Sequence, residues 1–325
     1  MKHISILVPR GAILGSLEGS RQLLSQVNEF YKAKGAPPLF IVQLVGLTKE
    51  TKVTGGLFTV NCNTVINDVK KTDLIIIPAL DGDLKEAIEN NKEFIPWIVS
   101  QHHNGAEVAS LCLGAFLLAS TGLLKGRKCA THWMATNAFR TMFPDVELVT
   151  EKIITDEYGI YSSGGAFSYL NLILYLIEKY AGREIAVLSA KVFAIEIERQ
   201  NQLPFTIFQG QKEHDDESIK QAQEFIEKNF HERITIDELA SMVSVSRRNF
   251  ERRFKKATAN TVAEYIQRVK IEAAKMSLEK SRENVNEVMY NVGYNDSKAF
   301  RTTFKRITGL SPIQYRSKYN REMVA

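Results

Sequence analysis

The sequence FERRFKKAT at residues 250–258 recurs as FRTTFKRIT at residues 300–308, an offset of fifty residues (300 − 250). Upstream, TIDE at residues 235–238 pairs with NVNE at residues 284–287, an offset of 49 (284 − 235). Each upstream segment has the pattern of a capping box, in which the first side chain accepts a backbone N–H and the Glu reaches back. One unit of capped helix, tight turn and second helix therefore occurs twice.

The second helix of each copy is predicted to have one buried face and one polar face. Its two Phe residues lie four positions apart and are expected to face the core. Its other face carries donors suited to base edges and phosphates in a major groove. The alternative is an ordinary bundle with a charged surface, but the duplication and the matched turns at Ser244–Ser246 and Gly293 favour DNA binding. The predicted DNA-contacting residues are Arg248, Glu251, Arg252 and Lys255 in the first copy and Ser297, Lys298, Arg301, Thr302 and Lys305 in the second.

Charge is unevenly distributed along the chain. Residues 217–325 hold 21 Lys+Arg and 14 Asp+Glu, a net +7 (21 − 14), which leaves 21 (42 − 21) and 23 (37 − 14), a net −2, for residues 1–216. The basic excess thus coincides with the repeat, where a polyanion would be met. A length of 325 residues suits two domains. No apolar run approaches the ~20 residues that span a bilayer, and three scattered Cys do not form a disulfide pattern, so we expect a cytoplasmic protein without membrane association.

The C-terminal third resembles the AraC/XylS family of bacterial transcription regulators. The resemblance covers residues 217 to about 318 and rests on the segments IDELA (236–240), SRRNF (246–250), VGY (292–294), FRTTFK (300–305) and GLSP (309–312). It implies that two reading helices enter successive major-groove segments of double-stranded operator or promoter DNA. Two roles are open for Glu251: it accepts from a cytosine amino group, or it orients Arg248 and Arg252, which we favour.

The first two hundred residues alternate apolar runs with helical stretches. This alternation predicts an α/β domain with a doubly wound, mostly parallel sheet. Strands are expected at 4–8, 40–45, 74–77 and 108–111, with shorter ones near 128–131, 147–150 and 160–162. Helices are expected at 18–34, 84–103, 115–121, 133–142, 167–180 and 184–196.

The segment SLCLGAF at residues 110–116 leads from a buried strand directly into a helix, with Cys112 at the junction. This is the pattern of a nucleophile elbow, where the helix N-terminus is expected to lower the thiol pKa. His132 follows another predicted strand, so the two side chains are expected to meet at the carboxyl edges of adjacent strands. The alternative is a small buried Cys and a satisfied His. Cys129 and His132 are too few ligands for a zinc site, and no metal or cofactor is predicted.

Together with GLLKGR (122–127), SGG (163–165) and the segments 182–184 and 202–205, these residues resemble the PfpI-like domain of GlxA-type regulators, which precedes an AraC-type domain. The resemblance covers about residues 1–200 and implies a flavodoxin-like fold of the class I glutamine amidotransferase type. Enzymatic relatives add an acid after the first strand. Here Ser16 occupies that position and Glu18 lies two residues late. Cys112, His132 and Glu18 are therefore interpreted as vestigial or sensing residues of a non-enzyme.

Three interpretations of this domain remain open. A non-catalytic small-ligand sensor is favoured, followed by a redox or electrophile sensor at Cys112 and by a cysteine-dependent hydrolase or lyase of the PfpI type. A third class of function for the whole chain is an architectural DNA binder without an effector.

The predicted organisation is a sensor domain at residues 1–198, a polar linker at 199–216 and a DNA-binding domain at 217–325. A small-molecule effector is expected to change how the DNA-binding domains are presented. The resemblance also implies homodimerisation through the N-terminal domain, and RNA polymerase is a candidate partner. The sequence does not identify the effector, the operator or the sign of regulation.

Overall fold

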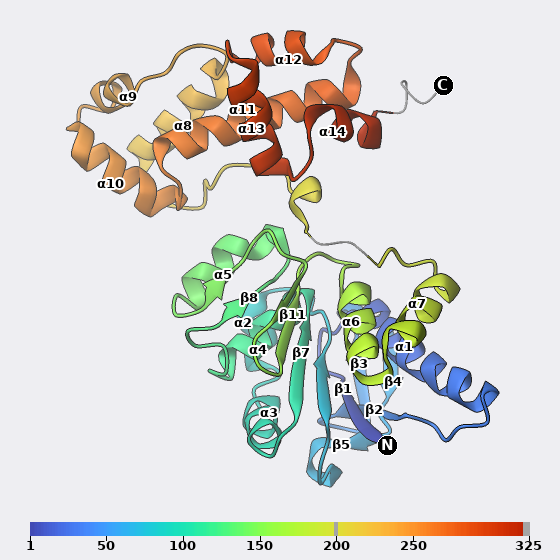
Figure 1. Cartoon of the computed structure of the whole chain (residues 1–325). Coiled ribbons are helices and arrows are strands. Elements are labelled where there is room, and N and C mark those ends of the chain that lie inside the picture. The colour runs from blue at the N-terminus through green and yellow to red at the C-terminus, as the bar shows by residue number, and fades with distance from the viewer. Residues whose placement is uncertain (198–200, 321–325) are drawn as a thin grey trace. The chain divides into compact units, whose positions relative to one another are not determined.

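The computed structural model describes residues 1–197 and 201–320, and it divides into two compact units, Met1–Gln202 and Leu203–Ala325 (Figure 1). The first unit is built around a seven-stranded sheet with the order β10-β11-β7-β6-β1-β2-β5. All neighbouring pairs in it are parallel except β10–β11, which confirms the predicted mostly parallel α/β fold. The strands of this sheet are β1 (Lys2–Leu7), β2 (Phe40–Gly46), β5 (Thr64–Val65), β6 (Leu74–Ile77), β7 (Glu107–Leu111), β10 (Ile154–Asp156) and β11 (Ile160–Ser163).

Helices cover both faces of the sheet because its strands are apolar on both sides. On one face, Ile76 packs in a core shared with α1 (Leu14–Ala33), α6 (Tyr169–Ala181) and α7 (Arg183–Val192). On the other face, Ile75 and Ile77 pack with another set of helices. That second set comprises α3 (Phe94–His103), α4 (Ala115–Ser120) and α5 (Thr136–Met142).

Several short elements depart from the sequence prediction. The hairpin of β3 (Glu50–Val53) and β4 (Phe58–Asn61) was not expected, nor were β5 and β10. The predicted strands at 128–131 and 147–150 pair with each other, as β8 (Lys128–Cys129) and β9 (Glu147–Leu148), outside the main sheet. These pieces are only two to four residues long, too short for a period to be read from the sequence.

The single helix predicted at residues 84–103 is in fact two helices, α2 (Leu84–Glu89) and α3. The break contains Asn91, whose fully buried side chain holds both backbone groups of Arg10. Its Oδ1 accepts from the Arg10 N–H at 2.8 Å, and its Nδ2 donates to the Arg10 carbonyl at 2.9 Å. The prediction was wrong here because this partner lies 81 residues away in the sequence. Helix α7 likewise ends at Val192, before the predicted residue 196.

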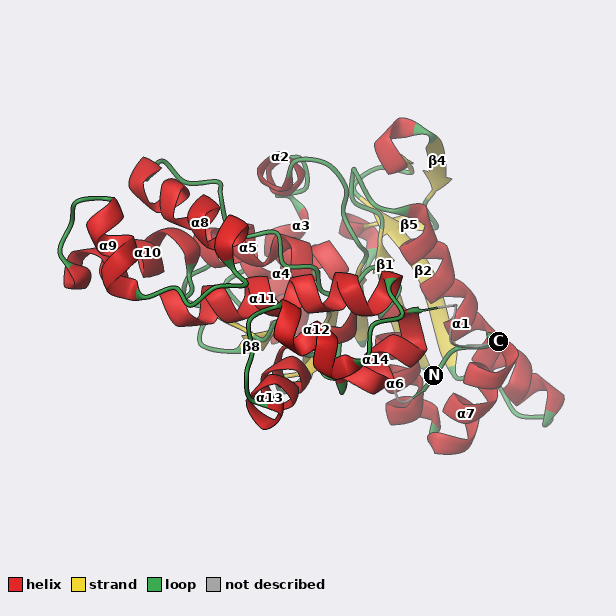
Figure 2. Ribbon diagram, turned by 90° about the horizontal axis from the view of Figure 1, so that it is seen from above, coloured by secondary structure: helices red, strands yellow, loops and turns green. Residues whose placement is uncertain are grey.

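The second unit is all-helical, and its elements gather at the two ends of α11 (Val262–Lys280) (Figure 2). At one end α11 shares a core with α8 (Glu217–Asn229), α9 (Ile236–Met242) and α10 (Arg247–Thr258). At the other end it shares a core with α12 (Val285–Asn291), α13 (Ser297–Thr308) and α14 (Pro312–Tyr319). Phe230 packs against both cores. The two predicted helix-turn-helix units are therefore joined by one continuous helix.

Four capping boxes start helices of this unit, and those at Thr235 and Asn284 confirm the prediction from the sequence. Those at Thr235 and Asn284 open the first helix of each repeat, and those at Thr261 and Ser311 open α11 and α14. In each box the cap side chain accepts from the backbone three residues on, while the Glu or Gln there accepts from the cap N–H. Such caps are short-range and therefore visible in sequence.

The predicted linker is largely part of the second unit. Its residues 199 and 200 lie outside the described residues, and Gln202 closes the first unit. From Leu203 onward the segment is held on α11, because the buried Lys275 ammonium donates to the Thr206 carbonyl and Glu272 accepts from the Phe208 N–H. The polar composition concealed these tertiary contacts. Within the described residues, no helix combines the length and apolar character that crossing a bilayer requires.

Candidate DNA-binding surface and the Cys112 region

The turn of the first helix-turn-helix unit lies between α9 and α10. Ser244 adopts a left-handed backbone conformation there, with φ of 54°. The following helix buries Phe250 and Phe254 completely, as predicted from their spacing. These two rings anchor α10, so its remaining faces are directed away from the core.

The corresponding turn of the second unit contains Gly293, with φ of 76°. A Cβ at this position would come within 2.3 Å of the His231 carbonyl oxygen, so only glycine fits. The Lys270 ammonium on α11 donates to the Gly293 carbonyl at 3.0 Å, and burial lowers the pKa of Lys270. Phe300 and Phe304 are fully buried on α13. The second turn is thus tied directly to the connecting helix.

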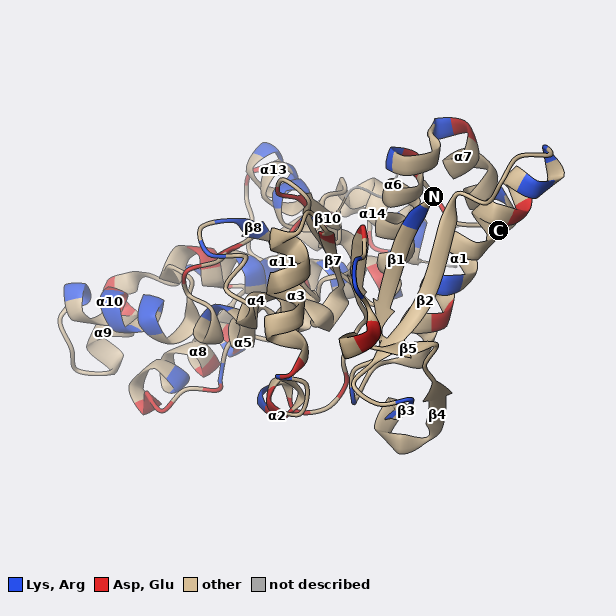
Figure 3. Cartoon of the chain, turned by 90° about the horizontal axis from the view of Figure 1, so that it is seen from below, with Lys and Arg blue, Asp and Glu red and all other residues tan. Residues whose placement is uncertain are grey.

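The predicted DNA-contacting side chains lie on the surface of α10 and α13, where Lys and Arg are concentrated (Figure 3). All are exposed except the half-buried Glu251. Within the described part of the chain, those on α13 form no ion pair or side-chain hydrogen bond, and neither do Arg248 and Lys255 on α10. Their donors are free for a partner. The α13 set is Ser297, Lys298, Arg301, Thr302 and Lys305.

The structure gives Glu251 a partner that the sequence interpretation did not foresee. Its carboxylate lies 3.6 Å from the Nε of Arg247, one turn earlier, and not against Arg248 or Arg252. Arg247 also donates to Asp237 on α9 at 3.2 Å, so it braces the helix-turn-helix unit. Arg252 donates to Asn249 at 2.9 Å. The expectation that Glu251 orients Arg248 and Arg252 was therefore wrong, because the i, i−4 position belongs to Arg247.

A second arginine of α10 holds the helix in place. Arg253 forms a two-pronged ion pair with Asp216, at 2.8 and 2.5 Å, and lowers the pKa of that carboxyl. Asp216 also caps α8 by accepting from the Ile219 N–H. Sequence reasoning placed Asp216 in the linker and missed this bridge. Its only sequence signal is an Asp immediately before a helix, which is an ordinary cap.

Cys112 lies in a strained turn between β7 and α4, as the elbow pattern predicts. Its φ is 53°, a left-handed value for a non-glycine residue. Gly114 allows close packing here, since a Cβ would lie 2.4 Å from the Pro78 carbonyl oxygen. The thiol, however, is 4% exposed, and burial raises its pKa to about 11. The expected lowering of the thiol pKa was wrong, because desolvation of the thiolate outweighs the helix terminus.

His132 is not hydrogen-bonded to Cys112 among the described residues. Its Nδ1 accepts from the Met134 N–H at 3.2 Å, its ring stacks on Trp133, and burial lowers its pKa. The strand before it, β8, is not a neighbour of β7 in the main sheet, contrary to the prediction. The two segments are linked instead by Thr131, whose hydroxyl donates to the Cys112 carbonyl at 3.0 Å.

The acid that enzymatic relatives require is not supplied by Glu18. Its carboxylate pairs with Arg21 on the surface of α1, and this pairing lowers the pKa of Glu18. Ser16 is buried with its hydroxyl already used: it donates to the Ile13 carbonyl and accepts from the Ala79 N–H. Neither side chain orients His132. Cys129 is fully buried, and no cluster of metal-ligating side chains occurs in the described ranges.

Gln202, at the end of the first unit, lies beside the Cys112 region. Its segment, 202–205, contributes to the PfpI-like resemblance, but no role was predicted for the side chain. Its buried amide donates to the carbonyls of Thr131 and Thr150 at 3.1 and 2.9 Å. Its Oε1 has no hydrogen-bond partner among residues 1–197 and 201–320. The side chain also passes so close to Gly164 that a Cβ there would lie 2.5 Å from the Gln202 Nε2. The start of the second unit is therefore one residue from a side chain packed against the Cys112–Thr131 segment.

Each of the two units matches a known protein family. Residues 239–318 match the helix-turn-helix domain family, and residues 38–179 match the DJ-1/PfpI family. The chain is 28% identical over 225 residues to the HTH-type transcriptional regulator GbdR of Pseudomonas aeruginosa, covering 68% of this chain and 60% of that protein. It is 26% identical over 263 residues to the HTH-type transcriptional regulator CdhR of the same species, covering 80% of this chain and 76% of CdhR. A solved AraC family transcriptional regulator from Pseudomonas putida shares the fold, with a TM-score of 0.51 at 15% identity, over 59% of this chain and 100% of that one.

Proposed function

We propose that this chain, a DJ-1/PfpI-type domain joined to an AraC-type helix-turn-helix domain, is a transcription regulator that binds specific sites in duplex DNA. The observation that carries the proposal is the pair of exposed faces on α10 and α13. Each belongs to a helix-turn-helix unit, and each presents basic side chains without partners in the described chain, such as Arg248 and Arg301. The named relatives are HTH-type transcriptional regulators.

The construction of the second unit suits two-site reading of DNA. Helix α11 contributes Tyr265 and Val269 to one core and Ile271 and Leu278 to the other, so it sets the spacing between the two units. Lys270 reinforces this spacing by binding both the Gly293 turn and the Glu232 carbonyl, at 3.0 and 3.5 Å. Rigid placement matters because base-edge contacts need donors held in register.

The first unit is proposed to act as a sensor and not as a catalyst. Three features support this proposal. The Cys112 thiol is protonated, and His132 accepts a hydrogen bond from the nearby backbone. The position expected for the acid holds Ser16, and the carboxylate of Glu18 pairs with Arg21. A nucleophilic mechanism needs a thiolate and an oriented base. A dimer through this unit and an effector-dependent change in DNA binding complete the proposal.

Gln202 offers a physical route for that change. Any displacement of Thr131 moves a hydrogen-bond partner of the Gln202 amide, and the next residue, Leu203, begins the second unit. An effector that favours one arrangement of this segment would bias the attached domain by its difference in affinity for the two arrangements.

The test uses the full chain and duplexes covering its own upstream DNA. Footprinting locates the site, and fluorescence anisotropy measures affinity across salt concentrations. We expect protected segments on one face of the duplex and a steep fall of affinity with salt, with a slope of about −0.9 for each phosphate neutralised. Lys298→Ala should weaken binding and flatten this slope, whereas Lys85→Ala, an exposed lysine of the first unit, should do neither.

The enzyme alternative is tested in parallel. Cys112→Ser should leave DNA affinity unchanged. We also expect the unaltered chain to show no thiol-dependent turnover, because the Cys112 thiol is protonated and no base is placed to deprotonate it. A substrate screen that finds multiple turnovers lost in Cys112→Ser, together with salt-independent or absent DNA binding, would overturn the proposal.

A further inference from the structure

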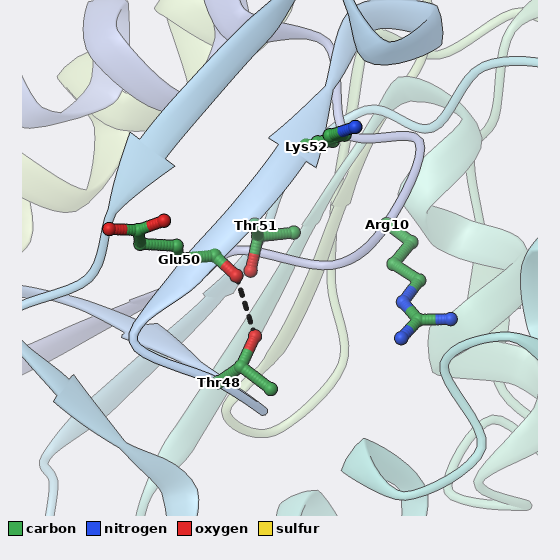
Figure 4. A pocket seen from close by; sticks show the side chains of 5 residues that line it. All are labelled: Arg10, Thr48, Glu50, Thr51 and Lys52. Carbon is green, nitrogen blue, oxygen red and sulfur yellow. Dashed lines mark hydrogen bonds between the residues drawn. The ribbon is translucent and has the colours of Figure 1, made fainter.

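A hollow of about 440 Å³ lies on the first unit, and Cys112 is not among the residues that line it. It is lined by Arg10 from the loop after β1 and by Thr48, Glu50, Thr51 and Lys52 from the β3–β4 hairpin region (Figure 4). The volume is within the range of about 300–1,000 Å³ that is typical of small-ligand pockets. A single water takes roughly 30 Å³ of liquid, so the hollow has room for more than a bare ion.

The hollow lies at the carboxyl edge of the parallel sheet, beside the point where the strand order reverses. The chain places β2 on one side of β1 and later adds β6 on the other, so the strand order reverses at β1. Ligands bind outside the carboxyl ends of strands at such a switch point. Arg10 stands three residues after the end of β1 and so borders this point. The other lining residues follow β2, so the hollow opens on the β2 side of β1.

Arg10 is held in place by its backbone and not by its side chain. The fully buried Asn91 bonds to both the N–H and the carbonyl of Arg10. The same amide also donates to the Ala87 carbonyl on α2 at 2.8 Å, so the Arg10 backbone is fixed to that helix. Because those bonds involve only main-chain atoms, the guanidinium remains available.

The opposite wall is also fixed. Thr54, at the end of β3, donates its N–H to the Ala12 carbonyl at 2.9 Å, and its hydroxyl accepts from the Leu14 N–H at 3.1 Å. These bonds tie the hairpin to the loop that carries Arg10. The backbones that carry Lys52 and Arg10 are thus fixed relative to one another before any ligand arrives, which lowers the entropic cost of binding.

The two cations lack counterions within the described residues. Neither Arg10 nor Lys52 forms an ion pair or a side-chain hydrogen bond there, and both are exposed. In Figure 4 the Glu50 carboxylate points away from Arg10, and the Thr48 hydroxyl donates to the Glu50 carbonyl at 2.6 Å. Arg10 and Lys52 both line the hollow, and a guanidinium and an ammonium at one site favour a carboxylate or phosphate group.

We propose that this hollow binds a small organic anion carrying a carboxylate or phosphate group, held by Arg10 and Lys52. Only the role given to the bound anion rests on the proposed function: in a regulator, the anion would be the effector. The binding event itself needs no DNA.

The experiment titrates the full chain with inorganic phosphate, with succinate and with uncharged succinamide, by calorimetry at low ionic strength. We expect saturable binding of succinate or phosphate and none of succinamide. Arg10→Gln and Lys52→Gln should each weaken it about tenfold, as loss of one charge-assisted hydrogen bond implies. The matched control is Lys49→Gln, an exposed lysine just outside the lining, which should bind as the unaltered chain does.

Two further readouts keep the result decisive. Glu50→Gln should tighten anion binding, because it removes the one negative charge of the lining. Unchanged melting temperatures show that the variants fold. The proposal is overturned if neither anion saturates at millimolar concentration, or if Arg10→Gln binds as tightly as Lys49→Gln. Anion binding without any DNA affinity would refute the regulator function and leave this site standing, so the two failures are distinguishable.

Discussion

The ammonium nitrogen of Lys275 lies 2.6 Å from the carbonyl oxygen of Thr206, a bond that joins the segment before α8 to the connecting helix α11. Lys275 is 3% exposed, and its charge is balanced by Glu272 at 2.7 Å, which in turn accepts from the Phe208 N–H at 3.0 Å. A buried ion pair therefore fastens the start of the second unit onto the helix that spaces its two helix-turn-helix units.

Removing one partner of the Lys275–Glu272 pair should lower the stability of the fold. Glu272→Ala leaves the buried ammonium of Lys275 uncompensated, so we expect the free energy of unfolding to fall by about 3 kcal/mol in urea titrations. The control, Glu224→Ala, removes an exposed partner of Lys228 and should cost less than about 1 kcal/mol. Equal losses of stability in the two variants would show that the buried Lys275–Glu272 pair stabilises the fold no more than an exposed pair does.

Arg301 should read sequence if it reaches a base edge. Arg301→Ala is then expected to weaken the footprinted site by about 1–3 kcal/mol more than random duplex of equal length, measured by anisotropy. Arg306→Ala is the matched control on the same helix, because the Arg306 guanidinium donates to Gln267 on α11. If Arg301→Ala weakens both duplexes equally, the side chain contacts only phosphate.

The two repeats differ at their left-handed positions. Ala259 ends α10 with φ of 55°, where Gly309 ends α13 with φ of 74°. Ala259→Gly should therefore relieve strain and stabilise the fold by up to about 1 kcal/mol, while Gly309→Ala should destabilise it by about 1–2 kcal/mol. Chemical denaturation of both variants measures this, and effects of the same sign would contradict it.

Gly293→Ala should be the most damaging change at a turn of this unit. Besides its positive φ, the new Cβ would lie 2.3 Å from the His231 carbonyl oxygen, a backbone atom that must shift. Ser244→Gly, at the equivalent turn of the first repeat, should instead be neutral or stabilising. Melting temperatures of the two variants separate steric clash from backbone preference, and a milder effect of Gly293→Ala than of Gly309→Ala would refute the clash.

Cys112 should be slow to react at neutral pH. Burial raises its thiol pKa from 9.0 to about 11, which leaves about a hundredfold less thiolate than in the unfolded chain. Iodoacetamide labelling of Cys112, followed by mass spectrometry at pH 7–9, should be slower by at least that factor in the folded chain than in urea. Labelling at equal rates would refute the protonated thiol.

The same shift predicts a pH dependence of stability. Because the folded-state pKa is above the unfolded value, the contribution of the protonated thiol is fully present below about pH 9 and is lost as pH rises through about 11. Cys112→Ala should therefore flatten the decline of stability across this alkaline window, as followed by denaturation at successive pH values. An unchanged decline would assign the alkaline loss to other groups.

Features with short-range causes could be predicted from the sequence. The four capping boxes and the buried Phe pairs depend on residues three or four positions apart, so their patterns survive without tertiary knowledge. The long strands of the parallel sheet are equally legible because they are apolar on both faces. The elbow at Cys112 also followed from a strand, a cysteine and Gly114 in succession.

Features that depend on distant partners could not be predicted. The break at Asn91 serves Arg10, 81 residues away, and the docking of Thr206 depends on Lys275, 69 residues away. The thiol pKa at Cys112 depends on burial, which no local pattern states. Three arginines lie near Glu251 in the sequence, and only the helix geometry shows that Arg247 is its partner.

The continuity of α11 through two cores has a consequence for affinity. In the proposed complex with DNA, α13 is already held near the next groove segment once α10 occupies its own. The contact of α13 is then an intramolecular event with a high effective concentration. Each half of the recognition site can therefore be weak on its own while the whole is bound tightly. A mismatch in either half-site would then be felt mainly as faster dissociation, because a stiff connection lets one half release only by straining the other.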